Sequence, residues 1–301
     1  MPRDNSDDSS DNPGEPLAIR TLPPMILSDQ RIMAALSLIE RDNTVRPSLE
    51  AVADAAGLSL FHFNRRFADT MGETIGAYIR RTRLDWAASA VIRTNASLLD
   101  TALRSGYASQ EAFTRAFIRQ FNVTPGGMRT AAAAAIPVPR LIDRERAKLV
   151  RPYWQEELPL IGTRFYGSYQ MVPLFWRRFA RQLQDLGFLL DHAQAIGILL
   201  DDPSITGPGL VRYDCCVVDR GYPPHLVKAP LWRRKAHGSQ FARVPIEGRN
   251  LDVRQTVRSV CIAWVQVHRK RFSDSPAYEL YDAPPWTHED WFNLSYLVPI
   301  A

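Results

Sequence analysis

Apolar residues recur every three or four positions from residue 28 to about residue 130, which is the period of an amphipathic helix. Proline is absent between residues 48 and 124, so nothing interrupts this helical pattern. From about residue 151 the pattern changes to short strand-like runs such as LIGTRFYG and RYDCCVVD, placed around two longer helical patterns. The chain is therefore predicted to form two domains: an all-α domain over residues 28–130 and an α+β domain over residues 151–301.

Two further stretches bound the helical domain. Residues 1–27 are rich in Ser, Asp, Asn, Pro and Gly and contain no apolar core, which predicts a disordered tail rather than a secretory signal. Residues 131–150 begin with a run of alanines that is followed by Pro137 and Pro139, and this composition predicts a linker.

The helical domain contains an internal repeat with a period of about 50 residues. The repeated residues are the small Ala53 and Ala102, the glycines Gly57 and Gly106, and the aromatic pairs Phe63–Phe67 and Phe113–Phe117. A helix-turn-helix needs a small residue where its helices cross, a residue that tolerates positive φ in the turn, and a second helix with one apolar face. The repeat supplies each of these twice, and Ser59 and Ser109 are placed to cap the second helices. Two helix-turn-helix units are therefore predicted.

The outward faces of the two second helices carry side chains suited to reading DNA bases. Asn64 and Arg65 lie on this face of the first helix, and Gln110 and Arg115 lie on that of the second. Arginine can donate two hydrogen bonds to guanine, and asparagine or glutamine can pair with adenine. The alternative is the solvated face of an ordinary helical hairpin. Because both copies keep the same register, the pattern favours a DNA-reading surface.

The second half of the chain also repeats itself. Residues 160–186 predict a strand that is closed by Gly167 and followed by a helix, and residues 239–268 predict a strand closed by Gly248 and a second helix. Each helix is followed by two further strands. The α+β domain is therefore predicted to consist of two βαββ repeats that pair into one curved sheet with a central groove.

Composition narrows the function classes without selecting one. The formal net charge of +5 is too modest to indicate nucleic acid by itself. No apolar run reaches about 18 residues, so no membrane span is expected. The odd count of cysteines (Cys215, Cys216 and Cys261) lacks the spacing of metal ligands, which favours a reduced, cytoplasmic protein without a metal. No nucleophile–base pair is visible, so we expect neither an enzyme nor a cofactor.

The segments SLEAVADAAGLSLFHFNRRFADTMGETIGAYIRRTRL and LLDTALRSGYASQEAFTRAFIRQFNVTPGGMR resemble the DNA-binding domain of the AraC/XylS family of bacterial transcription regulators. The resemblance covers residues 28–130. It implies two helix-turn-helix units, joined by a long helix, that enter successive major-groove segments of double-stranded DNA, so that a monomer reads both. The base-facing residues that it implies are Phe61, Asn64 and Arg65 in the first unit and Gln110, Glu111, Ala112 and Arg115 in the second. Phe61 stands where family members often carry tryptophan, so the preferred DNA sequence does not follow from the resemblance.

Residues 155–300 resemble the GyrI-like effector-binding domain. The features that carry this resemblance are the Gly-closed strand before a Trp-bearing helix, ILLDDP, and YELY ahead of the final strand. The resemblance implies a groove that takes small molecules, often flat lipophilic cations, whose charge meets a glutamate of the penultimate strand. By position the glutamate is Glu279, and the implied aromatic walls are Tyr166, Tyr169, Trp176, Tyr213 and Tyr296. The alternative is that these aromatic residues belong to the core and that Glu279 is exposed or paired with an arginine.

Three functions are compatible with these features. The first is a transcription regulator whose second domain binds a small-molecule effector. The second is a DNA reader whose second domain is a ligand-free module that docks on RNA polymerase or another protein. The third is a GyrI-like hydrolase fused to a DNA reader, against which the missing nucleophile–base pair and metal cluster argue. The first is our prediction.

Overall fold

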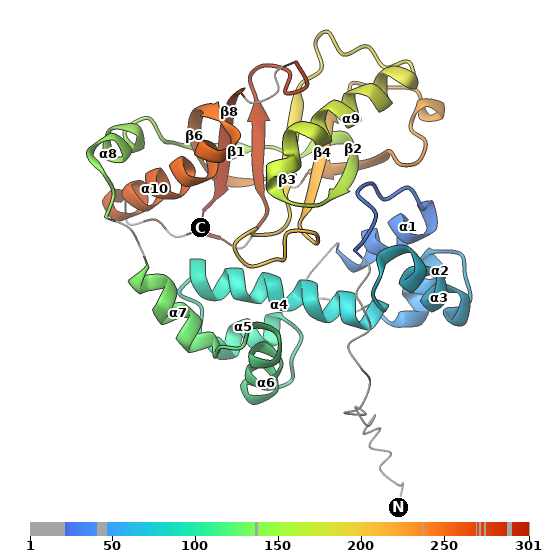
Figure 1. Cartoon of the computed structure of the whole chain (residues 1–301), viewed down its shortest axis with the longest axis horizontal. Helices are drawn as coiled ribbons and strands as arrows, with labels where there is room; N and C mark the ends of the chain where they lie inside the picture. The colour runs from blue at the N-terminus through green and yellow to red at the C-terminus, as the bar shows by residue number, and fades with distance from the viewer. Residues whose placement is uncertain are drawn as a thin grey trace, which may run out of the picture.

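The computed structural model describes residues 22–40, 47–135, 138–236, 238–268, 270, 272–273, 275–287 and 291–300. They form a helical domain and a domain built on one antiparallel sheet, with the long helix α4 running beside the sheet domain (Figure 1). The helices of the first domain are α1 (Gln30–Ile39), α2 (Leu49–Ala55), α3 (Leu60–Met71), α4 (Ile75–Arg93), α5 (Leu98–Arg104), α6 (Gln110–Phe121) and α7 (Pro125–Ala134).

Both helix-turn-helix units have the local structure that the sequence repeat predicts. The hydroxyls of Ser59 and Ser109 accept hydrogen bonds from backbone N–H groups in the first turns of α3 and α6, which satisfies donors that the helices leave unpaired. Gly57 and Gly106 take φ values of 62° and 80°, a region that strains residues with a side chain. The aromatic pairs Phe63–Phe67 and Phe113–Phe117 are fully buried. Two helix-turn-helix units are thus confirmed.

The long helix α4 is the central element of the helical domain. It packs against α3 of the first unit and against α5, α6 and α7 on the side of the second. Its buried face includes charged residues as well as apolar ones: Arg81, Arg83 and Asp85 are each at most 7% exposed. A shift of α4 would therefore be felt by both units.

The sheet domain has eight strands in the spatial order β1-β6-β8-β7-β3-β4-β2-β5, and each neighbouring pair is antiparallel. The strands are β1 (Arg151–Gln155), β2 (Leu158–Tyr166), β3 (Ala195–Leu199), β4 (Arg212–Val218), β5 (Trp232–Ala236), β6 (Ser239–Arg249), β7 (Ala277–Tyr281) and β8 (Trp291–Pro299). Its helical elements are α8 (Leu141–Ala147), η1 (Tyr169–Met171), α9 (Val172–Asp185), η2 (Pro224–Leu226) and α10 (Asn250–His268). The two edge strands, β1 and β5, are additional to the strands that the sequence predicts.

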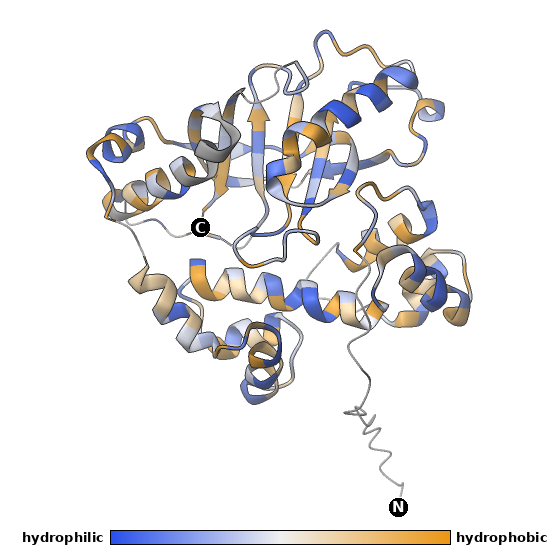
Figure 2. Ribbon diagram, in the orientation of Figure 1, coloured by the Kyte–Doolittle hydropathy of each residue, from blue (hydrophilic) through white to orange (hydrophobic). Residues whose placement is uncertain are grey.

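The two faces of the sheet are covered by different parts of the chain. One face packs against α9 and α10 around Phe175, Trp176 and Trp264. Hydrophilic residues follow the outward side of α9 (Figure 2), as expected for a helix that covers a sheet. The other face packs against α1 and the first helix-turn-helix unit, with Leu36 and Trp232 in one apolar cluster. The sheet is therefore buried on both faces, and the second face forms the interface between the domains.

The segments predicted as tail and linker differ from the prediction. Within residues 1–27, residues 1–21 lie outside the described residues, whereas residues 25–27 continue the sheet beside β2: the Tyr166 N–H donates to the Met25 carbonyl at 2.9 Å. Within residues 131–150, α7 extends to Ala134 and α8 packs against α10. Apolar residues of both segments belong to the domain cores. The polar composition of the first segment, and the alanine run and prolines of the second, gave no indication of this in the sequence.

Candidate functional site

The residues predicted to read DNA bases lie on the outer surfaces of α3 and α6. Phe61, Asn64 and Arg65 are exposed on α3, with Phe61 at 73% exposure. The Arg65 guanidinium lies 3.9 Å from the carboxylate of Asp69, and both side chains are more than 70% exposed, so this ion pair is weak and easily exchanged. In Figure 1, α6 lies on the side of α4 away from the sheet, and α3 lies near the amino-terminal end of α4. The sheet domain therefore leaves both helices uncovered.

The second unit presents Gln110, Glu111 and Arg115 to solvent, whereas Ala112 is half-buried. Glu111 folds back onto the amino-terminal end of its own helix. Its own backbone N–H and the Ser109 hydroxyl donate to the carboxylate and hold the pKa of Glu111 below its ordinary value. The predicted contacts of α6 are thus brought together on one surface, with the acidic residue occupying the helix end.

The candidate effector site centres on Glu279 of β7, which is fully buried. Three tyrosine hydroxyls donate to its carboxylate: Tyr213 at 2.6 Å, Tyr281 at 2.7 Å, and Tyr169. Burial, followed by the negative charge of Glu279, raises the pKa of each of these phenols well above its ordinary value, so all three remain protonated donors. The Trp176 Nε1–H donates in turn to the oxygens of Tyr213 and Tyr281.

Strand register explains how this aromatic cage is assembled. Glu279 is paired across the sheet with Gly197 of β3 on one side and with Tyr296 of β8 on the other. A Cβ at Gly197 would lie 1.9 Å from the Tyr213 hydroxyl, so only glycine leaves room for Tyr213 to reach Glu279. Tyr281 belongs to the cage but was absent from the sequence prediction. Its position two residues after Glu279 in YELY, on the same face of the strand, could have revealed it.

The five aromatic residues predicted to line the effector site lie in three different environments. Tyr169 and Tyr296 line part of a cavity of about 1940 Å³ that extends between the domains, from Ser37 of α1 to Cys261 of α10. Trp176 and Tyr213 lie behind them, with Glu279, in the core. Tyr166 is on the opposite face of the sheet, in the apolar cluster with α1, so its assignment to the effector site is corrected here. The physical reason is that alternate residues of β2 face opposite sides, and Phe165 occupies the cage side.

On the interface side of the sheet, charged residues from both domains form a docking cluster, which consists of Glu40, Tyr78, Arg164, Asp201, Arg212 and Asp214. Glu40, at the end of α1, accepts hydrogen bonds from Arg164 at 2.6 Å and Arg212 at 2.8 Å. Burial alone would raise the pKa of Glu40, but the charges of Arg164 and Arg212 outweigh burial and hold it well below its ordinary value. Glu40 is thus ionised at neutral pH, and the ion pairs of the docking cluster join the two domains.

Strand β4 connects the docking cluster to the cage. Tyr213 points into the cage, whereas its neighbours Arg212 and Asp214 point to the docking cluster, because successive residues of a strand face opposite sides. A movement of Tyr213 would therefore also displace its chain neighbours Arg212 and Asp214, whose ion pairs attach the helical domain to the sheet.

A second interface contact predicts a dependence on pH. The buried Asp85 of α4 accepts a hydrogen bond from Thr206 of the sheet domain at 3.1 Å. Burial raises the pKa of Asp85 from 3.8 to about 6, and the charge of Asp201 adds to this, while Arg81 opposes it. Because the native chain then binds a proton more readily than the unfolded chain, native stability falls as pH rises from about 4 to about 6 and is recovered as pH falls through 6.

The asparagine of Asp85→Asn cannot ionise. The free energy of unfolding of this variant, minus that of the wild type, is therefore expected to be about 1–3 kcal/mol more favourable to the variant at pH 7.5 than at pH 4.5. Urea unfolding of both chains at the two pH values measures this difference. Asp185→Asn, at an exposed site on α9, is the matched control. An equal stability difference between Asp85→Asn and the wild type at both pH values would contradict the assignment.

Among the residues that the structure describes, no group of three His, Cys, Asp or Glu side chains is arranged to hold a metal ion, and no helix is long and apolar enough to cross a membrane. The three cysteines are buried thiols. Cys215 and Cys216 face opposite sides of β4, as expected from their adjacent positions.

Comparison with known proteins shows similarity in both domains. Residues 52–131 match a helix-turn-helix domain family, and residues 153–301 match the GyrI-like small molecule binding domain family. The chain is 29% identical over 242 residues to the transcriptional regulator Rob of Salmonella typhimurium, which covers 77% of this chain and 84% of that protein. It is 40% identical over 119 residues to the right origin-binding protein of Escherichia coli, covering 38% of this chain and 41% of that protein. It is 35% identical over 104 residues to the regulatory protein SoxS of Escherichia coli, covering 34% of this chain and 97% of that protein.

Proposed function

Because the chain belongs to the AraC/XylS family of transcription regulators and carries a GyrI-like small molecule binding domain, we propose that it reads a specific DNA sequence under the control of a small-molecule effector. One observation supports this proposal most strongly: α3 and α6 are two helices with exposed polar faces. Each begins at a serine cap and packs through two buried phenylalanines against its own apolar cluster. Rigid, uncovered helices of this kind suit insertion into the major groove.

Within this proposal, the base contacts come from both units. Arg65 and Arg115 are the candidates for guanine, and Asn64 and Gln110 are the candidates for adenine. Phe61, at 73% exposure, supplies an apolar contact for a thymine methyl group. Glu111 and Ala112 complete the surface of α6, where the carboxylate of Glu111 is placed to accept from a cytosine amine.

For the effector we propose a lipophilic cation that binds against the cage. Tyr169, Trp176, Tyr213, Tyr281 and Tyr296 lie around a buried carboxylate, and both aromatic rings and a carboxylate can attract a delocalised positive charge. Tyr169 lines the cavity and also donates to Glu279, so a ligand approaching from the cavity meets Tyr169 first. Displacing this phenol would bring the cation close to the carboxylate.

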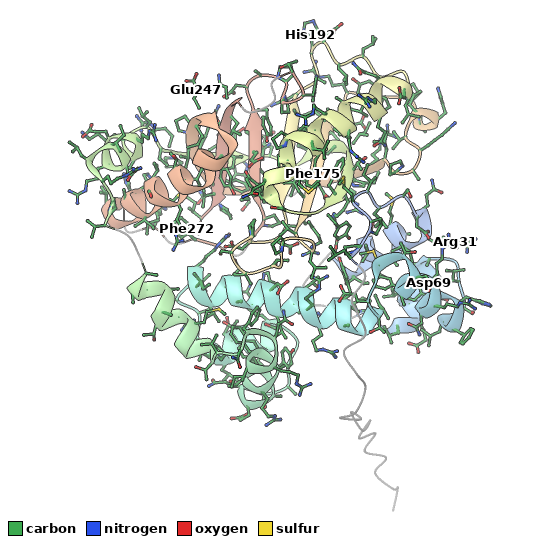
Figure 3. The ribbon with its side chains drawn as sticks, in the orientation of Figure 1. Arg31, Asp69, Phe175, His192, Glu247 and Phe272 are labelled. Atoms are coloured by element: carbon green, nitrogen blue, oxygen red, sulfur yellow. The ribbon has the colours of Figure 1, made fainter. Side chains whose placement is uncertain are left out.

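The effector proposal is tested by calorimetric titration of the full chain with tetraphenylphosphonium. Glu279→Gln keeps the shape of the side chain but removes the negative charge, so we expect affinity to fall by about 10- to 100-fold, as for the loss of one nearby charge at reduced dielectric. Glu247→Gln, at an exposed site on β6 (Figure 3), is the control for a surface charge and should bind as the wild type does. Unchanged affinity in a folded Glu279→Gln variant, checked by near-ultraviolet circular dichroism, would exclude Glu279 from the site.

A second candidate for the sheet domain is a ligand-free module that docks on another protein, such as RNA polymerase. It is favoured by one observation: the three tyrosine hydroxyls already satisfy most of the hydrogen-bonding capacity of Glu279. This candidate predicts that the wild-type chain binds no tetraphenylphosphonium, so the same titration separates the two functions.

Two finer statements belong to this proposal. The segments β2-α9-β3-β4 and β6-α10-β7-β8 have the same element order, which supports our interpretation of the sheet domain as two βαββ repeats. Two of the named relatives, Rob and SoxS, are regulators, and we propose that this chain likewise binds its small molecule without converting it.

A further inference from the structure

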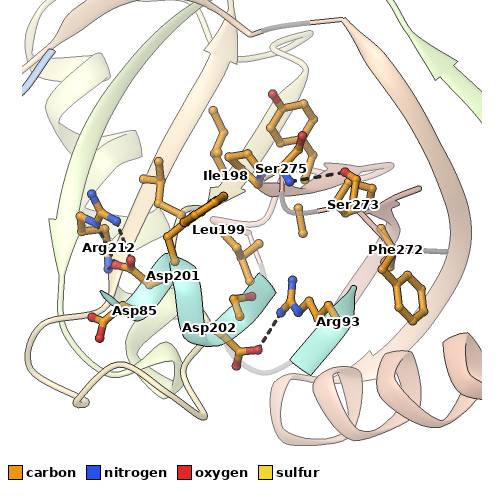
Figure 4. A pocket seen from close by; sticks show the side chains of 18 of the residues that line it. Asp85, Arg93, Ile198, Leu199, Asp201, Asp202, Arg212, Phe272, Ser273 and Ser275 are labelled. Atoms are coloured by element: carbon orange, nitrogen blue, oxygen red, sulfur yellow. Dashed lines mark hydrogen bonds and ion pairs between the residues drawn. The ribbon is translucent and has the colours of Figure 1, made fainter. Parts of the chain in front are cut away.

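The cavity beside the cage is walled by both domains. From the sheet domain it is lined by Tyr169, Tyr296 and Cys261, and from the helical domain by Ser89, Ile92 and Arg93, in the carboxy-terminal half of α4. Figure 4 shows the Arg93 side chain directed toward Asp202 in the loop of the sheet domain. A molecule in the cavity would therefore contact α4 as well as the sheet domain.

Arg93 and Asp202 both line the cavity and are partly exposed, and we call this pair its mouth. The Arg93 guanidinium lies 2.7 Å from the Asp202 carboxylate, and the two side chains are 33% and 17% exposed. This ion pair joins the last turn of α4 to the segment between β3 and β4. Although burial raises the pKa of Asp202, the charge of Arg93 and the hydrogen bonds from Ser204 hold it below its ordinary value, so the pair is ionised.

The charge of Arg93 also reaches the inner end of the cavity. Burial raises the pKa values of Cys261 and Tyr296, and the positive charge of Arg93 opposes this rise at both groups. Tyr296 is in turn the cross-strand partner of Glu279. The charge of Arg93 thus acts on Tyr296, whose cross-strand partner is the buried Glu279.

We infer that the effector site is composite: the effector spans the interdomain cavity, with its charged or aromatic end against Tyr169 and Tyr296 and its outer end against the Arg93–Asp202 pair of α4 and the β3–β4 loop. This inference rests on the proposed function and adds that the DNA-reading domain itself contributes part of the ligand site. The effector class remains a lipophilic cation, because the inner end is aromatic and backed by Glu279.

The composite site gives the effector a direct route to the DNA-reading helices. A ligand shifts a protein between two arrangements only if it binds them with different affinities. Contact with Arg93 meets this condition, because undocking of α4 removes one wall of the site. Since α4 packs against both helix-turn-helix units, a ligand that changes how α4 lies against the sheet domain acts on an element that both units share.

The test is calorimetric titration of the full chain with tetraphenylphosphonium and with tetraphenylborate, an anion of the same shape. Arg93→Gln removes a positive charge from the mouth and releases Asp202, so it is expected to bind tetraphenylphosphonium about three- to tenfold more tightly and tetraphenylborate more weakly. Asp202→Asn should change both affinities in the opposite directions. Arg93→Lys keeps the charge, so its two affinities should shift in the same directions as those of Arg93→Gln but by less. Arg80→Gln is the matched control, because Arg80 is exposed on the same helix outside the cavity.

The outcomes separate this inference from the proposed function. If the wild-type chain binds tetraphenylphosphonium and both Arg93→Gln and Asp202→Asn bind it within about twofold of the wild type, the composite site is overturned while the cage remains. If the wild-type chain binds no tetraphenylphosphonium, the effector proposal fails and the composite site fails with it. A charge-dependent change at Arg93 and Asp202, with none at Arg80, supports the inference.

Discussion

Arg164→Ala is expected to lower the free energy of unfolding by about 3–5 kcal/mol, because it leaves buried carboxylates without their cation. The Arg164 guanidinium is 4% exposed and donates to Asp214 at 2.9 Å and to Glu40 at 2.6 Å. After the substitution, Asp214 has no guanidinium opposite it in the docking cluster, and Glu40 retains only Arg212 of its two arginines. Urea unfolding at pH 7, followed by circular dichroism, measures the loss.

The matched control is Arg178→Ala, at an exposed position on α9, which should stay within about 0.5 kcal/mol of the wild type. Arg164 lies in the interface, so its variant should also separate the unfolding of the two domains into distinct transitions. A loss below about 1 kcal/mol with a single transition would mean that the docking cluster does not hold the domains together.

Arg65→Ala and Arg115→Ala are each expected to weaken binding to the specific DNA site by about 1–3 kcal/mol and to relax selectivity at one base position. The two arginines lie on different helices, and Arg65 pairs with Asp69 of its own helix, so the double variant should show the sum of the two losses. Fluorescence anisotropy with labelled duplex at fixed salt measures these affinities.

Arg144→Ala, at an exposed site on α8, is the control for the loss of one positive charge and should leave the preference between specific and scrambled duplexes unchanged. If Arg65→Ala and Arg115→Ala weaken binding to both duplexes equally, these arginines contact phosphates rather than bases. If neither weakens binding at all, α3 and α6 are not the reading helices.

The features that the sequence predicts well are local ones. The caps at Ser59 and Ser109, the positive φ of Gly57 and Gly106, and the burial of the repeated phenylalanines all depend on residues a few positions apart. Such short-range relations follow from helix geometry alone.

The features that the sequence does not predict depend on distant partners. Glu40 meets Arg164 and Arg212 from 124 and 172 residues away, and nothing beside Glu40 in the chain indicates this. The prediction that Tyr166 lines the effector site is wrong. Tyr166 is the last residue of β2 and Tyr169 lies in η1, so the alternation of strand residues does not relate the directions of the two side chains. The helix α8 was hidden by the prolines before it, and its packing against α10 is a tertiary effect.

The central claim, that this chain reads two segments of DNA, is tested most directly by selecting bound duplexes from a random pool with the full chain. We expect the selected duplexes to share two conserved segments about one helical turn apart. We also expect them to bind at least about a thousandfold more tightly than scrambled duplexes at the same salt concentration. A pool with no shared sequence, bound with the same steep salt dependence as any duplex, would contradict the claim, because only phosphate attraction would then be present.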